Sequence, residues 1–141
     1  MDQRKKTLRK PGVENKYGLT VSKIEDFVVV NKDKLIRSGR VWRNELEFAW
    51  CFFQSVGNGR GLYGGEILNV LVEFYDQPQE NGKSIKVSCS YIMEDMCDYP
   101  FEEFFKEEDM ETNWDLELQE VLLAFANFLL DEGIVIFKNI N

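Results

Sequence analysis

The 141-residue sequence contains no histidine. Histidine is the usual general base of enzymes, the usual proton shuttle and the commonest metal ligand. Without it, Ser-His-Asp and Cys-His nucleophile systems cannot be built from this chain. A catalytic site would have to rely on carboxylates, lysine, tyrosine or a borrowed metal. We therefore expect a protein that is not an enzyme and that has no cofactor.

Cysteine and long apolar runs are also scarce. Cys51, Cys89 and Cys97 are an odd number and form no CxxC pair, which predicts reduced thiols rather than a disulfide framework. The basic residues near the start are followed by no apolar run, so no secretory signal is expected. The longest apolar stretch, residues 121–130, is about half a bilayer span and is interrupted by Asn127, so no transmembrane helix is expected. These features predict a cytoplasmic protein.

Charge is distributed unevenly along the chain. Residues 1–43 contain twelve Lys and Arg against five Asp and Glu, whereas residues 44–141 contain five against twenty. The densest part is residues 94–120, with twelve acids and one base, Lys106. Such a field repels nucleic acids and anionic lipids and attracts basic protein surfaces. We expect a protein partner with a basic surface, no direct contact with nucleic acid and no membrane association.

The length corresponds to one domain, and a composition that is 44% hydrophobic and 13% aromatic excludes wholesale disorder. Residues 1–17 are polar, basic and interrupted by Pro11 and Gly12, which predicts a flexible basic arm. Residues 18–141 are predicted to form a single α+β domain. The arm could bind nucleic acid, but the acidic body opposes this, and a disordered or self-docking arm is favoured.

A first helix is predicted from Ser22, which has capping-box spacing to Glu25, to a stop at Gly39. Its apolar face would contain Ile24, Phe27, Val28 and Leu35. The β-branched run at residues 28–30 opposes this prediction. Three arginines at a spacing of three could form a small anion site on one helical face or pair with the acidic half: Arg37, Arg40 and Arg43.

Three segments alternate as strands do. In residues 45–53 the apolar set is Leu46, Phe48, Trp50 and Phe52, although a helix using Leu46, Trp50 and Phe53 remains an alternative. Residues 67–76 and 84–92 show clear periods of two. The linker at residues 77–82 contains Pro78 and an Asn-Gly pair, which predicts a hairpin between the second and third strands.

Asp98 and Pro100 resemble a cap and a first-turn proline, and they predict a short acidic helix to about Glu108. A long helix capped by Thr112 or Asn113 should follow and should end near Gly133. Its apolar stripe would contain Leu118, Val121, Leu122, Phe125 and Leu129. Residues 134–137 are predicted to form a last strand. This order predicts an α+β fold, with an antiparallel sheet of about four strands and two or three helices packed on one face.

Two ligand motifs have better structural explanations. Residues 59–64 fit GxGxxG, but the alternating segment that follows is typical of a strand and not of the helix that binds a pyrophosphate. The glycine-rich segment from Gly57 to Gly65 is therefore predicted to connect two strands. Residues 109–120 have EF-hand spacing, but Trp114 occupies the position that requires glycine. No metal site is predicted.

The acidic residues after position 94 either solvate the surface or engage a basic groove of another protein. Interleaved aromatic residues favour the second interpretation, because interface centres use such anchors. We expect a small inhibitor, such as an immunity protein or a phage-encoded blocker, that occludes a nuclease or another nucleic-acid-handling protein. The predicted partner-binding residues are Tyr99, Glu102, Glu103, Glu107, Glu108, Asp109, Glu111 and Trp114. The alternatives are a structural or adaptor protein with a solvating acidic face, and a carboxylate- or metal-dependent enzyme that uses residues 57–65.

Overall fold

The computed structural model describes residues 12–56, 66–91, 99–100 and 113–138. Three helices lie in these ranges: α2 (Val21–Glu25), α3 (Lys32–Arg37) and α5 (Asn113–Asp131). The first strands are β1 (Phe27–Val29), β2 (Trp42–Arg43), β3 (Phe48–Val56) and β4 (Glu66–Phe74). The remaining strands are β5 (Ile85–Tyr91), β6 (Tyr99–Pro100) and β7 (Val135–Phe137).

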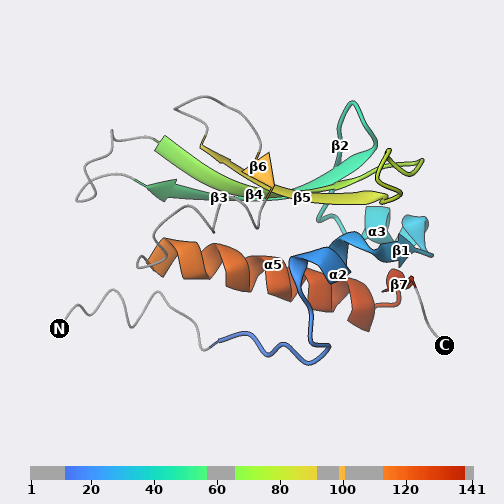
Figure 1. Ribbon diagram of the computed structural model, residues 1–141, viewed down its shortest axis with the longest axis horizontal. Coiled ribbons are helices and arrows are strands. Elements are labelled where there is room, and N and C mark those ends of the chain that lie inside the picture. The colour runs from blue at the N-terminus through green and yellow to red at the C-terminus, as the bar shows by residue number, and fades with distance from the viewer. Residues whose placement is uncertain (1–11, 57–65, 92–98, 101–112, 139–141) are drawn as a thin grey trace.

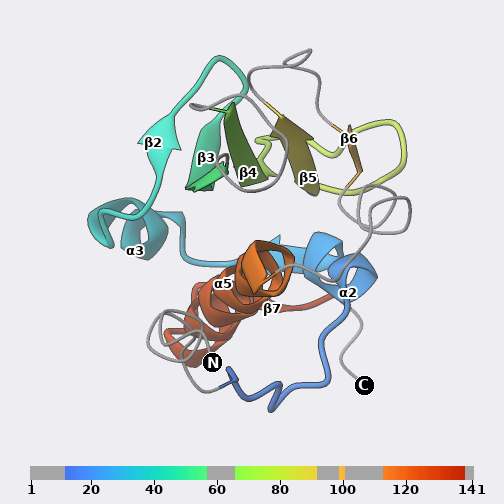
Figure 2. The ribbon, with the colours of Figure 1, turned by 90° about the vertical axis from the view of Figure 1, so that its left-hand side faces the viewer.

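The main sheet is antiparallel and has the strand order β2-β3-β4-β5-β6. The long helix α5 runs beneath it, as Figure 1 shows. Seen from the end, α2 and α3 lie on the same side of the sheet as α5 (Figure 2). The predicted α+β class, with an antiparallel sheet of about four strands and helices on one face, is confirmed.

The core lies between this sheet and α5. Strand register places Phe48 opposite Phe74 and Phe74 opposite Ile85, so that matching apolar positions share the inner face. These side chains are buried together with the apolar stripe of α5, whose buried members are Leu118, Leu122, Phe125 and Leu129. The predicted stripe is therefore confirmed, with Val121 only partly buried.

The single helix predicted from Ser22 towards Gly39 is wrong. The segment divides into α2, β1 and α3, and the residue that caps α2 is Thr20, whose side chain accepts a hydrogen bond from the backbone N–H of Lys23. The β-branched run becomes β1 because it pairs with β7, with Val28 opposite Ile136. Gly39 follows α3 with a φ of +73°, as predicted for a helix end.

The segment at residues 45–53 is a strand from Phe48 onward and not a helix. Before it, the side chain of Asn44 accepts hydrogen bonds from the backbone N–H groups of Leu46 and Glu47, which forms a tight turn. This turn breaks the alternation. Leu46, predicted to share the inner face, is therefore 49% exposed, whereas Glu47 is buried.

Strands β4 and β5 form the predicted hairpin. The backbone N–H of Gln79 donates to the carbonyl of Lys83, and Gly82 has a φ of +82°, which favours glycine. The last predicted strand is present as β7, but it belongs to a separate two-stranded sheet with β1.

The helix predicted to start at Asp98 and Pro100 is wrong at its beginning. Tyr99 and Pro100 form the edge strand β6, where they lie opposite Cys89 and Ser88. An edge strand tolerates proline because one row of its backbone groups needs no partner in the sheet. The rest of that predicted helix, residues 101–108, lies outside the described residues.

Candidate binding cleft

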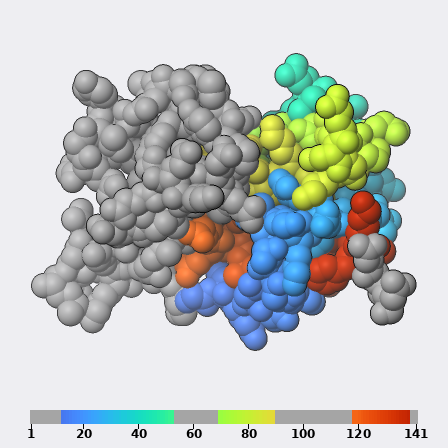
Figure 3. Space-filling view, in the orientation of Figure 1, coloured from blue at the N-terminus to red at the C-terminus, as the bar shows by residue number. Residues whose placement is uncertain are grey.

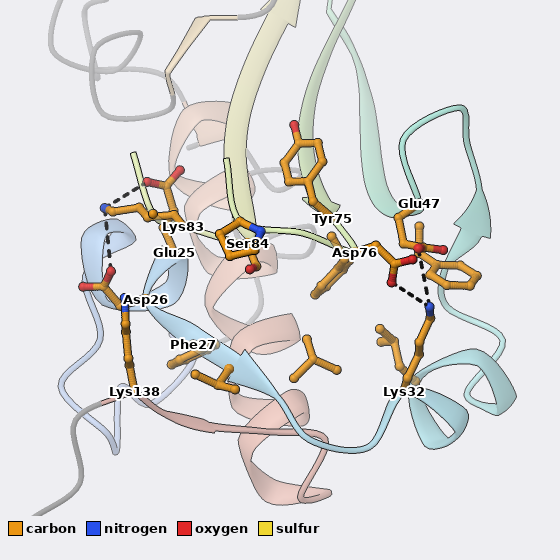
Figure 4. Close-up of a pocket in the computed structure, with 17 residues that line it drawn as sticks. Glu25, Asp26, Phe27, Lys32, Glu47, Tyr75, Asp76, Lys83, Ser84 and Lys138 are labelled. Carbon is orange, nitrogen blue, oxygen red and sulfur yellow. Dashed lines mark hydrogen bonds and ion pairs between the residues drawn. The ribbon is translucent and has the colours of Figure 1, made fainter. Parts of the chain in front are cut away.

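A cleft of about 400 Å³ lies between β1 and the end of the main sheet where β4 turns into β5. Figure 4 shows β1 running along the cleft, with Tyr75 and Ser84 on the opposite wall. The apolar surface comes from Phe27, Val29, Leu35, Phe48 and Phe74. Charged side chains of both signs lie at its two ends. The cleft exists because the small β1–β7 sheet and the main sheet are separate sheets.

At one end, Lys83 lies between two carboxylates from the end of α2. Its Nζ atom is 3.5 Å from Glu25 and 3.9 Å from Asp26. The second oxygen of Glu25, Oε2, accepts a hydrogen bond of 2.8 Å from the backbone N–H of Val87 in β5. This end therefore joins α2 to the main sheet through one carboxylate.

At the other end, Lys32 of α3 lies between Glu47 and Asp76, at 3.4 and 3.1 Å (Figure 4). Its ammonium group also lies 5.2 Å from the ring centroid of Phe48. A hydrogen bond to Asp76 raises the pKa of Lys32. A hydrogen bond with Glu47, followed by the contact with Lys32, lowers the pKa of Asp76. An aspartate carboxyl is ionised at neutral pH, and these contacts favour the charged form of Asp76 further.

This arrangement is suited to binding. A cleft of a few hundred Å³ with an apolar centre and a few fixed polar groups is the usual form of a ligand site. Within the described ranges, no three His, Cys, Asp or Glu side chains group closely enough to hold a metal ion. No sequence motif indicated the cleft, because its walls come from α2, β1, α3 and the β4–β5 hairpin, which only the tertiary fold brings together.

The structure describes two of the eight predicted partner-binding residues. Tyr99 belongs to β6 and Trp114 to the first turn of α5. The six acids of that set fall outside the described ranges: Glu102, Glu103, Glu107, Glu108, Asp109 and Glu111. The end of β5 and the start of α5, which flank this segment, lie at the end of the molecule opposite β1 and the β4–β5 hairpin (Figure 1), which line the cleft.

The glycine-rich segment 57–65 connects β3 to β4, as predicted. These strands are antiparallel neighbours, with Val56 opposite Glu66. A strand therefore follows the glycines where a dinucleotide site requires a helix N-terminus. The topology provides no βαβ unit at this position.

The three arginines do not share one helical face. Arg37 lies in α3, Arg40 follows it, and Arg43 lies in β2. The guanidinium of Arg40 stacks on Phe128 at 4.1 Å from the ring centroid, and that of Arg43 lies 5.5 Å from Phe48. Two of these arginines thus cover the edges of the core.

The last residues of the predicted arm contact α5. Lys16 lies 2.9 Å from Asp131, and the hydroxyl of Tyr17 donates a hydrogen bond to the same carboxylate. The side-chain amide of Asn127 donates to the carbonyl of Glu14 at 2.9 Å. In Figure 3 this N-terminal part, in dark blue, lies against the orange and red helix. Residues 14–17 are therefore connected to the domain.

Comparison with known proteins adds no assignment: no protein-family model, curated protein or solved structure matches the chain. None of the helices in the described ranges has the length and apolarity needed to span a membrane.

Proposed function

We propose that this protein is a small cytoplasmic inhibitor, of the immunity-protein or phage-encoded-blocker type, that occludes a basic nucleic-acid-handling site on a partner protein. The observation that carries the proposal is the separation of charge between the framework and one segment. The acidic carboxylates take the place of phosphates, and the partner's basic groove receives them.

We use the term framework for residues 12–52, 69–89 and 118–138. The framework is nearly neutral, with twelve acidic and ten basic side chains. Several of these are paired, including Lys16 with Asp131 and Lys34 with Glu132. Residues 90–117, by contrast, contain eleven acids and one base. Net charge far from zero favours solubility, but concentrating eleven acids in one segment also costs self-repulsion that dispersed charges would avoid.

The described parts that flank this segment lie at one end of the molecule, where β5 ends and α5 begins (Figure 1). Between them in the sequence, β6 pairs with β5 at Ser88 and Cys89. A concentrated field speeds encounter with a basic partner, whereas aromatic contacts such as those of Tyr99 and Trp114 would slow release.

The test uses two variants with the same change in net charge. One replaces Glu102, Glu103, Glu107 and Glu108 by glutamine. The matched control neutralises four exposed framework acids in the same way: Glu14, Asp33, Glu45 and Glu80. Both variants and the parent are used to capture proteins from a lysate of the native host, and association rates with the captured partner are then measured at low and physiological salt.

We expect the partner to bind the parent and the control but not the first variant. The association rate of the parent should fall steeply with salt, and duplex DNA should compete for the partner. Unchanged affinity in the first variant, or binding that DNA does not affect, would contradict occlusion. An adaptor with a solvating acidic face would then be favoured.

A further inference from the structure

Strand β1 has a partner on one side only. It pairs with β7 in a two-stranded sheet, and the cleft lies along its other side (Figure 4). In an antiparallel pair, the N–H and C=O groups of alternate residues point away from the partner strand. No hydrogen bond joins the backbone of residues 27–29 to any described residue outside β7. An open strand edge therefore faces the cleft.

We propose that an extended peptide segment of a partner protein binds in this cleft as a third strand beside β1. An open edge presents a donor and an acceptor on every second residue, and an extended backbone matches that spacing. The cleft volume of about 400 Å³ lies within the range of ligand sites, about 300–1,000 Å³. The described residues that line the cleft do not belong to the acidic segment, so the two proposals do not depend on each other.

The cleft also defines the side chains of the peptide. Its apolar surface, which includes Leu35 and Phe74, suits β-branched residues that project to one side of the added strand. Four carboxylates and three lysines line it, so its charge is slightly negative. The most exposed acids lie at opposite ends, with Asp26 at 47% and Asp76 at 66% exposure. Basic side chains of the peptide that flank its apolar residues would lie near Asp26 and Asp76.

The probe is the end-blocked pentapeptide Lys-Val-Thr-Val-Lys, added to the full-length ¹⁵N-labelled protein. We expect saturable shifts of the backbone amides of residues 27–29 at millimolar peptide, and slower hydrogen exchange at the amides that point away from β7. Two N-methylated peptides provide the control, one methylated at both valines and the other at the threonine and both lysines. Each methylation pattern removes the N–H groups along one edge of the peptide strand. The peptide methylated on the edge that faces β1 should lose binding, and the other peptide should keep it.

Charge gives a second, independent readout. Asp76→Asn and Asp26→Asn should each weaken the probe severalfold, whereas Glu45→Gln, outside the cleft, should not. The glutamine variant at Glu102, Glu103, Glu107 and Glu108 should bind the probe like the parent. The proposal is overturned if residues 27–29 do not respond, or if the two N-methylated peptides bind equally. Protection of these amides that rises with protein concentration and without peptide would instead identify β1 of a second copy as the occupant.

Discussion

The carboxylate of Glu25 accepts a hydrogen bond of 2.8 Å from the backbone N–H of Val87. A side chain at the end of α2 thereby supplies an acceptor to β5 next to the point where β6 begins to pair at Ser88. Since Val87 is buried, its N–H would otherwise lack a partner. This bond fixes the N-terminal helix to the main sheet, and it positions one end of the cleft.

Glu25→Ala should lower the free energy of unfolding by about 1–3 kcal/mol, because it leaves the N–H of Val87 unsatisfied. Glu25→Gln keeps an acceptor oxygen and should cost less. Urea denaturation measures both effects, and hydrogen exchange at the amide of Val87 should accelerate in the alanine variant alone. Equal losses in the two variants would show that the charge of Glu25, and not this hydrogen bond, is what matters.

The centre of the core is a stacked pair, in which Trp50 and Phe125 have centroids 4.3 Å apart and an interplanar angle of 7°. Phe125→Ala should cost about 3–5 kcal/mol of unfolding free energy, as truncation of a buried aromatic usually does. Leu46→Ala, at an exposed apolar position, should cost about 0.5 kcal/mol or less. An unchanged denaturant midpoint for Phe125→Ala would be incompatible with this packing.

Removal of the N-terminal arm should have an effect that depends on where it is cut. Deleting residues 1–12 should change the Tm by a few degrees at most, because that stretch has no apolar pattern. Deleting residues 1–17 also removes the carbonyl that accepts from Asn127 and two described partners of Asp131, Lys16 and Tyr17. We expect a further drop in Tm beyond that of the shorter deletion. If both truncations melt at the same temperature, the contacts of residues 14–17 contribute nothing in solution.

The contact of Asp131 with the arm should weaken at both extremes of pH. Hydrogen bonds from Lys16, and then from Tyr17, lower the pKa of Asp131, so its stabilisation is present above about pH 4 and is lost as pH falls. The hydrogen bond to Asp131 raises the pKa of Tyr17. The stabilisation from this hydrogen bond is therefore present below about pH 10 and is lost as pH rises further.

Asp131→Ala provides the measurement. Urea denaturation over a pH series gives the difference in unfolding free energy between parent and variant. This difference should be constant near neutral pH. It should become smaller towards pH 3 and towards pH 11, about one unit beyond the ordinary pKa values of aspartate and tyrosine. If the difference in unfolding free energy stays the same at acid pH, the ionised carboxylate of Asp131 does not stabilise the protein through Lys16 and Tyr17.

Elements specified by local patterns were predictable. The apolar stripe of α5 requires only the helical period, and Asn81-Gly82 specifies the turn of the hairpin because glycine at φ +82° fits it. The single helix predicted over residues 22–39 is wrong because Val28 and its neighbours satisfy two local patterns. Pairing with β7, far along the chain, decides between them. Pro100 was misassigned in the same way, since its pairing with β5 is not local.

The sequence alone determined the separation of charge along the chain, because it fixes the order in which acidic and basic residues occur. It also determined the fold class through its alternating and helical periods. Only the tertiary structure decided where the cleft lies. Lys32 of α3 pairs with Glu47 and Asp76, and Lys83 of the β4–β5 hairpin pairs with Glu25. These residues are far apart in the sequence and meet only in the folded chain. Such contacts depend on long-range pairing, which short-range sequence patterns do not encode.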